Sequence, residues 1–502
     1  MRIDRGWDRS ASRAFDLVII PAPGNYMGSF IVTSHSGPYG YLQDVPLVLY
    51  GPGFVKPLGH TKLDREVTIA DLAPTYARLM GFGGWPKRHS RPLTEVLEDT
   101  TDTPRLIVTT VVDGGGWNAL ERWPDSWPNI ARLMEDGASV DDAIVGSSPS
   151  ITPATHTNIS VGDFPKRHGV TAIAVRGPTT RLVGSFSKRP GAVGGRNMDP
   201  RVSLKLTTVA DLWDRSVNNE AEIGFLASGN LALGLLGFGA ALPGGDRDIA
   251  ALHRDEKWST TPAFYSLPDY VAEIEGPRAE IDAVDQLDGR LDGRWLGHAI
   301  EPFAGTPALA PWTNRVTTEI LGREGFGRDE ITDLWYMNLK APDTAGHKWN
   351  MIAEEQRDVL ASVDQAVADL LEWLDRNVGE GNYVFVLTAD HGQTPLDRGG
   401  WPIDRSEIQA DIDRRFDKVD NDKGLVQRTS ASSFFMHRSE IQESGTTPEE
   451  IASFLSRYTI GDNIPEGEEV PEGFEDRLEE RVMSGVIPGR KIADVLACTR
   501  SD

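Results

Sequence analysis

Short apolar runs, many of them β-branched, recur along the chain, and each is followed by polar residues and a turn. Several of these runs precede stretches of helical periodicity, an alternation that is typical of α/β proteins. Strands buried on both faces of a parallel sheet show the same near-continuous apolar pattern. The predicted strands are 15–20, 30–33, 45–50, 106–112, 223–226, 334–339 and 383–388. We therefore predict an α/β fold with a central, mostly parallel sheet.

Three helices are predicted from periodicity and end signals. The longest covers 353–377 and has its apolar residues on one face. A second covers 69–80, where Thr68 is a suitable cap and Gly81 a suitable stop. A third follows Thr152.

Composition and charge narrow the class of protein. Hydrophobic residues make up 39% and charged residues 25% of the 502 residues, as in ordinary globular proteins. The net charge of −24 opposes binding to nucleic acid or to an anionic membrane, so an anionic substrate needs local attraction, which bound cations would supply. The single cysteine, Cys498, excludes an internal disulfide. Charges near the N-terminus and the absence of a long apolar stretch favour a cytoplasmic protein without membrane attachment.

Acidic and histidine side chains follow four of the predicted strands. In open α/β sheets, ligands bind beyond the carboxyl ends of the strands, so these positions are candidates for a site. The residues are Asp113 after 106–112, Asp343 and His347 after 334–339, Asp390 and His391 after 383–388, and His35 after 30–33. Carboxylates mixed with imidazoles suit zinc, and six such side chains are enough for two ions. A single histidine at one strand end would more often be structural.

Thr152 is the candidate nucleophile. It precedes Pro153, which suits the first turn of a helix, so its hydroxyl is predicted to lie at a helix N-terminus. Free backbone amides and the positive end of the helix dipole favour an alkoxide and a phosphate oxygen there. The alternative is that Thr152 merely caps the helix.

Four motifs occur in an informative order: Asp113 in VVDGGGW, the Thr152 segment that ends in PKRHGV, DTAGH at 343–347 and TADHG at 388–392. This order resembles the alkaline phosphatase superfamily, and most closely its type I phosphodiesterase/nucleotide pyrophosphatase branch. The resemblance covers 105–170 and 333–395. It implies a three-layer sandwich with an alkaline-phosphatase-like fold, and an enzyme that hydrolyses phosphodiester or pyrophosphate bonds through a phosphothreonine at Thr152.

One metal-binding histidine of that branch normally follows the DHG element near the C-terminus. Only His437 follows it here, in a setting that lacks the expected glycines. The expected setting, TSHSGPYGYLQDVPLVLYGPG, surrounds His35 near the N-terminus. We therefore predict a circular permutation, in which 1–98 supplies the usual ending of the catalytic domain and the two chain ends lie close together.

The predicted domain organisation follows from the permutation. Residues 105–173 carry the nucleophile, and 331–502 carry the remaining metal ligands. Residues 174–330, rich in Gly, Pro and Trp, are interpreted as an inserted cap that shapes the substrate pocket.

The resemblance also implies two divalent metal ions, which we expect to be Zn²⁺. Asp113, Thr152, Asp390 and His391 would hold one ion, and Asp343, His347 and His35 the other. One ion would lower the pKa of the threonine hydroxyl, and the pair would stabilise the attacking and leaving oxygens. The expected substrate is a small phosphate ester.

One departure from the family's sequence pattern leaves the identity of the substrate undetermined. Many relatives have an asparagine five residues after the histidine of HG, where this chain has Ile173. Other donors must then hold the phosphate oxygens, such as the Thr152 amide, Lys340 or an arginine of the cap.

A phosphomonoesterase is the nearest alternative function, because the same metals serve both reactions. A non-catalytic binding protein would be expected to have lost metal ligands. A sulfatase is disfavoured by the absence of the Cys/Ser-x-Pro-x-Arg pattern around Thr152, and a cofactor-independent mutase would usually carry a serine there.

Overall fold

The central strand of the molecule is β5 (Leu106–Val112), whose seven residues are all buried. In this computed structural model, Ile107 and Val111 belong to the core on one face of the sheet. Val108 and Val112 belong to the core on the other face. The strand is apolar throughout because both of its faces are covered. The structure describes residues 2–7, 15–28, 32–176, 182–187, 198–254, 257–419 and 421–498.

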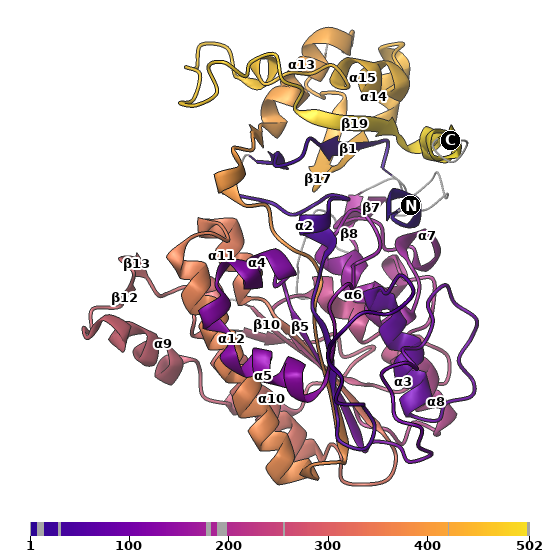
Figure 1. Ribbon diagram of the computed structural model, residues 1–502. Helices are drawn as coiled ribbons and strands as arrows, with labels where there is room; N and C mark the ends of the chain where they lie inside the picture. The colour runs from indigo at the N-terminus through magenta and orange to yellow at the C-terminus, as the bar shows by residue number, and fades with distance from the viewer. Residues whose placement is uncertain are drawn as a thin grey trace.

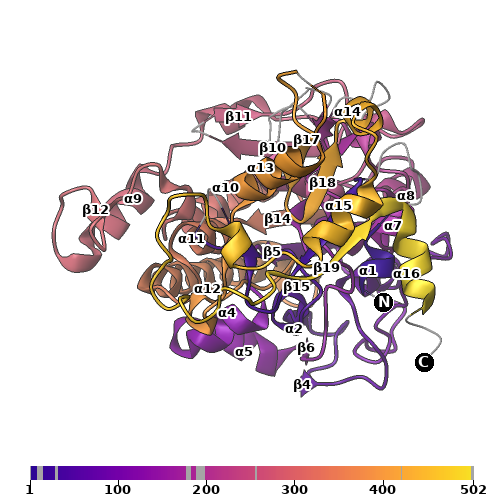
Figure 2. The same cartoon turned by 90° about the horizontal axis from the view of Figure 1, so that it is seen from above.

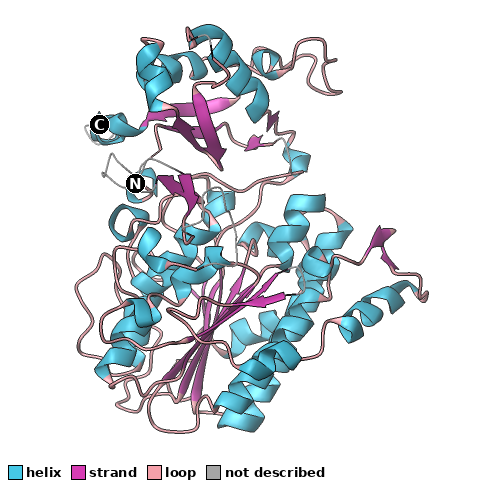
Figure 3. Cartoon of the chain, turned by 180° about the vertical axis from the view of Figure 1, so that it is seen from behind, coloured by secondary structure: helices cyan, strands magenta, loops and turns pink. Residues whose placement is uncertain are grey.

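β5 lies in a nine-stranded sheet that is mostly parallel (Figure 3). The order is β11 (Lys257–Ser259), β10 (Ile249–Arg254), β9 (Ile223–Ala227), β14 (Asp333–Leu339), β5, β15 (Tyr383–Ala389), β3 (Leu47–Tyr50), β6 (Ala138–Val140) and β4 (Gly59–Thr61). The five strands from β10 to β15 pair in parallel, whereas β11 and β3 run antiparallel to their neighbours. The strands from β5 to β15 therefore end at one common edge.

Helices cover both faces of this sheet and complete the three-layer α/β fold (Figure 1). One face is covered by α3 (Leu72–Leu79), α6 (Thr152–Val161) and α8 (Val209–Ser216). The other is covered by α5 (Pro128–Asp136), α10 (Leu309–Glu324) and α12 (Glu354–Leu374). The three predicted helices are confirmed as α12, as α3 with the preceding turn Ile69–Asp71, and as α6. Thr68 forms a capping box with Asp71, as its position predicted.

A smaller lobe lies over the carboxyl edge of the sheet (Figures 1 and 2). Its antiparallel sheet has the order β17 (Val426–Ser430), β18 (Ser433–Met436), β1 (Leu17–Pro21) and β19 (Met483–Pro488). It is covered by α13 (Arg405–Phe416), α14 (Arg438–Glu443) and α15 (Pro448–Leu455). Thus residues from near both ends of the chain build one sheet.

The remaining elements are short. They include α1 (Arg2–Arg5), α2 (Gly40–Gln43), α4 (Trp117–Arg122), α7 (Pro165–His168), α9 (Arg278–Asp285), α11 (Ala341–Trp349) and α16 (Ile492–Cys498). Three two-stranded pairs are β2 (Tyr26–Met27) with β16 (Pro402–Ile403), β7 (Ala174–Arg176) with β8 (Leu182–Gly184), and β12 (Arg294–Trp295) with β13 (His298–Ala299). In the part of the chain that the structure describes, no helix combines the length and apolar character needed to cross a bilayer.

Two predicted strands form but are not parallel strands, so that part of the prediction is wrong. The run at 15–20 becomes β1, which is antiparallel to both neighbours in the smaller lobe. The run at 45–50 becomes β3, which is antiparallel to β15 and β6. Both runs are apolar because both faces are buried, and burial on two faces does not determine strand direction. Of the predicted strand 30–33, residues 30 and 31 lie outside the described residues, and Val32 and Thr33 are in no strand.

Residues 174–330, interpreted from sequence as a cap, contribute β9, β10 and β11 to the central sheet. They also contribute α8 and α10 to its two faces. The layers of the fold do not follow the predicted domain boundaries at 98, 173 and 330. The division of the chain into domains at these positions therefore stays a prediction. Close to the two chain ends, α1 packs against α16 (Figure 2).

Candidate metal centre

Three strands bring the acidic candidates to one edge of the sheet. Asp113 directly follows β5, and Asp390 directly follows β15. Asp343 lies in the first turn of α11, shortly after β14. These strands are adjacent and parallel, so their carboxyl ends meet, as the sequence predicted. All three aspartates are buried.

His35 reaches this edge from the N-terminal segment. Its Nε2 lies 3.3 Å from Asp343 Oδ1, and its ring stacks on that of His391 with centroids 3.5 Å apart. Nδ1 lies 3.0 Å from the carbonyl oxygen of Ser150, whose hydroxyl in turn donates to the carbonyl of His35. His347, on α11, places Nε2 at 3.3 Å from the same Asp343 oxygen. The fold therefore brings together all six predicted carboxylate and imidazole side chains.

Their nitrogen and oxygen atoms form three overlapping groups. His35, Asp343 and His347 form one, Asp113, Asp343 and His391 another, and Asp113, His156 and Asp390 the third. Within each group the potential ligand atoms lie within 4.8 Å of one another. The division of these residues between two ions stays a prediction.

Three buried atoms in these groups make no hydrogen bond with any described residue: Asp113 Oδ1, Asp343 Oδ1 and His391 Nε2. A buried polar atom without a partner costs about 1–3 kcal/mol, and more when the group is charged. Here the lone pairs converge, with His391 Nε2 at 3.5 Å from Asp113 Oδ1 and 3.3 Å from Asp390 Oδ2. Divalent cations satisfy such an arrangement, so the residues present fit metal ions of the class that accepts nitrogen and oxygen ligands.

The electrostatics of the site separate two of its buried carboxyl groups, Asp390 and Asp343. Burial raises the pKa of Asp390 well above its ordinary value, and the neighbouring Asp113 raises it further. Burial also opposes ionisation of Asp343, but His347, Lys340 and His35 together hold its pKa well below its ordinary value. Burial lowers the pKa of His391 and of His347, which keeps both imidazoles in the neutral form that binds metals.

Thr152 is the first residue of α6, and its side chain does not cap the helix. The cap position is Ile151, which forms no side-chain cap hydrogen bond. The Thr152 hydroxyl instead lies 3.4 Å from Lys340 Nζ. The alternative interpretation of Thr152 as a helix cap is therefore wrong, because the backbone turns into the helix one residue earlier.

The helix terminus offers fewer free amides than its sequence predicted. The N–H groups of Ala154 and Thr155 both donate to the carbonyl oxygen of Ile151. Pro153 has no N–H group. Among the described residues, the amide of Thr152 itself has no acceptor, and it is the one available to a bound anion.

Lys340 links Thr152 to the carboxylates. Its Nζ lies 2.9 Å from Asp113 Oδ2 and 2.7 Å from Asp343 Oδ2. Burial alone would lower the pKa of Lys340, but Asp113, Asp343 and Asp390 outweigh burial and raise it. The ammonium group therefore keeps its proton and acts as a donor rather than as a base.

Asn338 was missed by the sequence analysis. Its Nδ2 lies 2.9 Å from Asp113 Oδ2 and 2.8 Å from His156 Nε2. His156 in turn contacts the carbonyl oxygen of Thr152 through Nδ1 at 2.9 Å. Asn338 is a buried polar residue inside an otherwise largely apolar strand, and that exception to the pattern was the available signal. These contacts fit a role for His156 and Asn338 in orienting the candidate ligands.

A cavity of about 560 Å³ opens beside Thr152. Its charged and polar lining includes Lys340, Asn338, His253 and Arg254. The remaining wall is largely apolar and includes Leu231, Ala232, Pro302, Phe303, Ala304 and Leu309. The carboxyl ends of β9 and β10 supply part of this wall.

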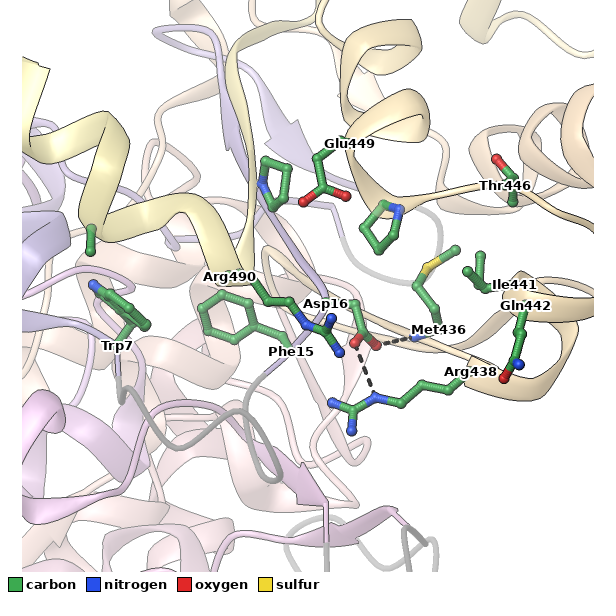
Figure 4. A pocket seen from close by; sticks show the side chains of 14 residues that line it. Trp7, Phe15, Asp16, Met436, Arg438, Ile441, Gln442, Thr446, Glu449 and Arg490 are labelled. Atoms are coloured by element: carbon green, nitrogen blue, oxygen red, sulfur yellow. Dashed lines mark hydrogen bonds and ion pairs between the residues drawn. The ribbon is translucent and has the colours of Figure 1, made fainter.

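A larger cavity of about 830 Å³ lies elsewhere, in and beside the smaller lobe, and contains none of the candidate ligands (Figure 4). Asp16 at its side accepts the backbone N–H of Met436 at 2.7 Å and pairs with Arg438 Nε at 3.4 Å. Asp16 and Arg438 of that cavity are thus paired with each other.

Comparison with known proteins agrees with this fold and site. The alkaline phosphatase PhoV of Synechococcus elongatus is 24% identical over 381 residues, which cover 65% of this chain and 67% of PhoV. The alkaline phosphatase PafA of Elizabethkingia meningoseptica is 24% identical over 339 residues, which cover 58% of this chain and 60% of PafA. The chain thus spans about three fifths to two thirds of the length of these relatives.

The crystal structure of wild-type PafA supports the fold. It matches with a TM-score of 0.53 at 18% identity, over 78% of this chain and 85% of that chain. Fold and site together define a hydrolase of phosphoric esters in the alkaline phosphatase superfamily. A family model described as type I phosphodiesterase/nucleotide pyrophosphatase matches residues 107–483, and the chain belongs to that family.

Proposed function

We propose that this phosphoesterase hydrolyses small phosphodiesters or pyrophosphates by attack of the Thr152 hydroxyl on phosphorus. The observation that carries the proposal is the position of that hydroxyl. It is 3.4 Å from Lys340 Nζ, in the wall of the 560 Å³ cavity, beside three buried ligand atoms that make no hydrogen bond. A cap role for Thr152 leaves this arrangement unexplained.

Asp113, Thr152, Asp390 and His391 would hold one divalent ion, and Asp343, His347 and His35 the other, with Zn²⁺ favoured by the mixture of imidazole and carboxylate. When bound, such ions lower the pKa of a coordinated hydroxyl and neutralise charge on ester oxygens. His156 and Asn338 orient the carboxylates and fix the start of α6.

The chain's own groups hold the substrate. The ammonium of Lys340 and the amide of Thr152 are donors within the site and can bind non-bridging phosphate oxygens. The positive end of the α6 helix dipole attracts the same negatively charged phosphate oxygens. Attack by Thr152 forms a phosphothreonine and releases the first alcohol or phosphate, and water then releases the second product.

The wall of the cavity favours a diester or pyrophosphate over a monoester. A diester carries two organic groups, and the apolar wall from Leu231 to Leu309 gives the second group a surface to bind. A monoester carries an additional negative charge. One observation supports that alternative, since Arg254 joins Lys340 in lining the cavity and two cations suit a dianion.

A matched pair of substrates separates the two functions. We expect a higher kcat/KM for a bis-aryl phosphate diester than for the monoester of the same aryl alcohol. A higher value for the monoester would reverse the preference and leave the nucleophile unaffected.

The nucleophile has a test of its own. Thr152→Ala should lower kcat/KM by at least about a thousandfold, because covalent catalysis is lost. Thr157→Val removes a hydroxyl from the same helix, where it contacts the Pro153 carbonyl, and should leave most activity. Full activity in Thr152→Ala would exclude Thr152 as the nucleophile.

A further inference from the structure

A group of three carboxylates lies far from the active site. Asp214 is near the end of α8, and Asp246 and Asp248 precede β10. One oxygen from each lies within 4.8 Å of the others. Two oxygens bound to one Ca²⁺ at about 2.4 Å can be at most about 4.8 Å apart, so the spacing suits a single ion of that size.

These carboxylates are poorly compensated. Asp248 is 8% exposed, and the described part of the chain offers its carboxylate neither a hydrogen bond nor an ion pair. Asp214 is 4% exposed, accepts the N–H of Ala221 and shares a side-chain hydrogen bond with Asp246, but its Oδ1 is buried without a partner among the described residues.

A neighbouring aspartate shows how this chain compensates a buried carboxylate. Asp211, on the same helix, accepts N–H groups from Thr208, Phe238 and Gly239. Among the described residues, Asp214 Oδ1 is buried and has no such donor. The difference indicates that Asp214 Oδ1 is arranged for a cation rather than for the backbone.

The loops around the group are fixed by their own contacts. Asn219 donates its backbone N–H to the Asp214 carbonyl and its side-chain N–H to the Gly244 carbonyl. These bonds hold the α8–β9 loop against the segment before β10. Asn219 Oδ1 is a further buried oxygen that has no partner in the described part of the chain.

We propose that Asp214, Asp246 and Asp248 form a second, structural cation site that takes a hard divalent ion of the calcium type. All its ligands are oxygens, without a histidine or cysteine, which favours Ca²⁺ over Zn²⁺. The ion joins the end of α8 to the segment that enters β10.

This site acts on stability and not on chemistry. It precedes the amino ends of β9 and β10, whereas the active-site cavity lies beyond their carboxyl ends. Strands of five to six residues separate the two by about 17–20 Å.

Thermal unfolding in graded concentrations of Ca²⁺ tests the proposal. We expect saturating Ca²⁺ to raise the Tm of the wild-type protein by about 3 °C or more. Asp248→Asn should lose this response, and so should Asp246→Asn, which changes the exposed member of the group. Without Ca²⁺, Asp248→Asn should melt at or above the wild-type temperature, because a buried unpaired charge has been removed.

Two control variants test whether the rise in Tm with Ca²⁺ arises at this carboxylate group. Asp343→Asn, in the active site, should keep the Ca²⁺ response, and so should Asp125→Asn, an exposed aspartate elsewhere. A wild-type Tm that does not change with Ca²⁺, or a response that persists in both Asp248→Asn and Asp246→Asn, would overturn the proposal. Neither result would bear on Thr152.

Discussion

Single atoms define the active site at the residue scale. Asp113 Oδ1, Asp343 Oδ1 and His391 Nε2 are buried without hydrogen bonds, although the chain pairs neighbouring atoms of the same side chains. Asp113 Oδ2, for example, is held by both Asn338 and Lys340. One oxygen of the carboxylate is thus fixed by the protein while the other is left for a ligand, which orients it in advance.

Replacement of His35 tests the contribution of the N-terminal segment. His35→Ala should weaken metal binding by at least about tenfold, since even the loss of an outer-shell partner costs that much in metal sites. Metal content after competition with a chelator measures the effect.

His437→Ala is the matched control, because His437 lies at the start of α14 and belongs to none of the candidate metal groups among the described residues. It should bind metal as the wild type does. Loss of metal in His437→Ala, with none in His35→Ala, would refute the assignment of His35.

His168 gives a pH prediction. Burial lowers its pKa from 6.5 to about 3, and Val170 donates its N–H to Nδ1 at 3.2 Å. The folded state therefore excludes a proton that the unfolded state accepts, so this contribution to stability is complete above pH 6.5 and declines as pH falls toward 3.

The measurement is the free energy of unfolding in urea at pH 7.5 and at pH 5. Between these values the wild type should lose about 2 kcal/mol more than His168→Gln, at about 1.4 kcal/mol per pH unit below 6.5. Equal losses in the two proteins would show that His168 is protonated in the folded state.

At the scale of elements, the position of Thr152 depends on how α6 packs. The helix lies against the 3₁₀ segment Asn230–Leu235, and the Ser160 hydroxyl donates to the Gly234 carbonyl. A Cβ added at Gly234 would lie 2.0 Å from Thr157 Oγ1 and 3.0 Å from Thr157 Cα. No side chain fits there without displacement of α6.

Gly234→Ala should therefore destabilise the protein by about 1–3 kcal/mol, as overpacking does, and also lower kcat/KM by moving the nucleophile. Thermal unfolding and steady-state kinetics measure the two effects. Gly276→Ala, where an added Cβ contacts nothing within 4 Å, is the control and should change neither. An unchanged kcat/KM in Gly234→Ala would show that the packing of α6 against Gly234 does not affect catalysis.

At the scale of the whole molecule, segments from near both chain ends share structure. β1 pairs with β18 and β19, α1 packs against α16, and the segment 32–50 supplies both His35 and strand β3 of the central sheet. This arrangement is consistent with the proposed circular permutation, since an early segment completes a site built by later ones.

A rearranged chain tests the permutation. We expect that joining the chain ends through a flexible linker and opening the chain at 102, in the largely exposed segment 98–103, gives a folded protein. Its kcat/KM should stay within about tenfold of the wild-type value, because the opening avoids the site. An opening between Asp343 and His347 in α11 should abolish metal binding. Aggregation of the first permutant would count against the proposal.

The sequence by itself determined the elements and most of the site. Apolar runs located β5, β9, β14 and β15 to within a residue or so, because burial on two faces leaves a continuous local pattern. Polar residues directly after those strands could be identified as ligand candidates, since the carboxyl ends of adjacent parallel strands must meet. His35 was also among these candidates, although Val32 and Thr33 before it are in no strand, and the resemblance assigned it to a metal ion.

Tertiary structure alone decided strand direction, lobe membership and the fine geometry of the site. The runs that became β1 and β3 are as apolar as those of the parallel strands, because burial and not direction determines composition. Asn338, the engaged amides of α6 and the partnerless oxygens of Asp214 and Asp343 depend on contacts between residues far apart in the chain. Such contacts fix hydrogen-bond partners and charge only after the chain has folded, so the sequence pattern carries little trace of them.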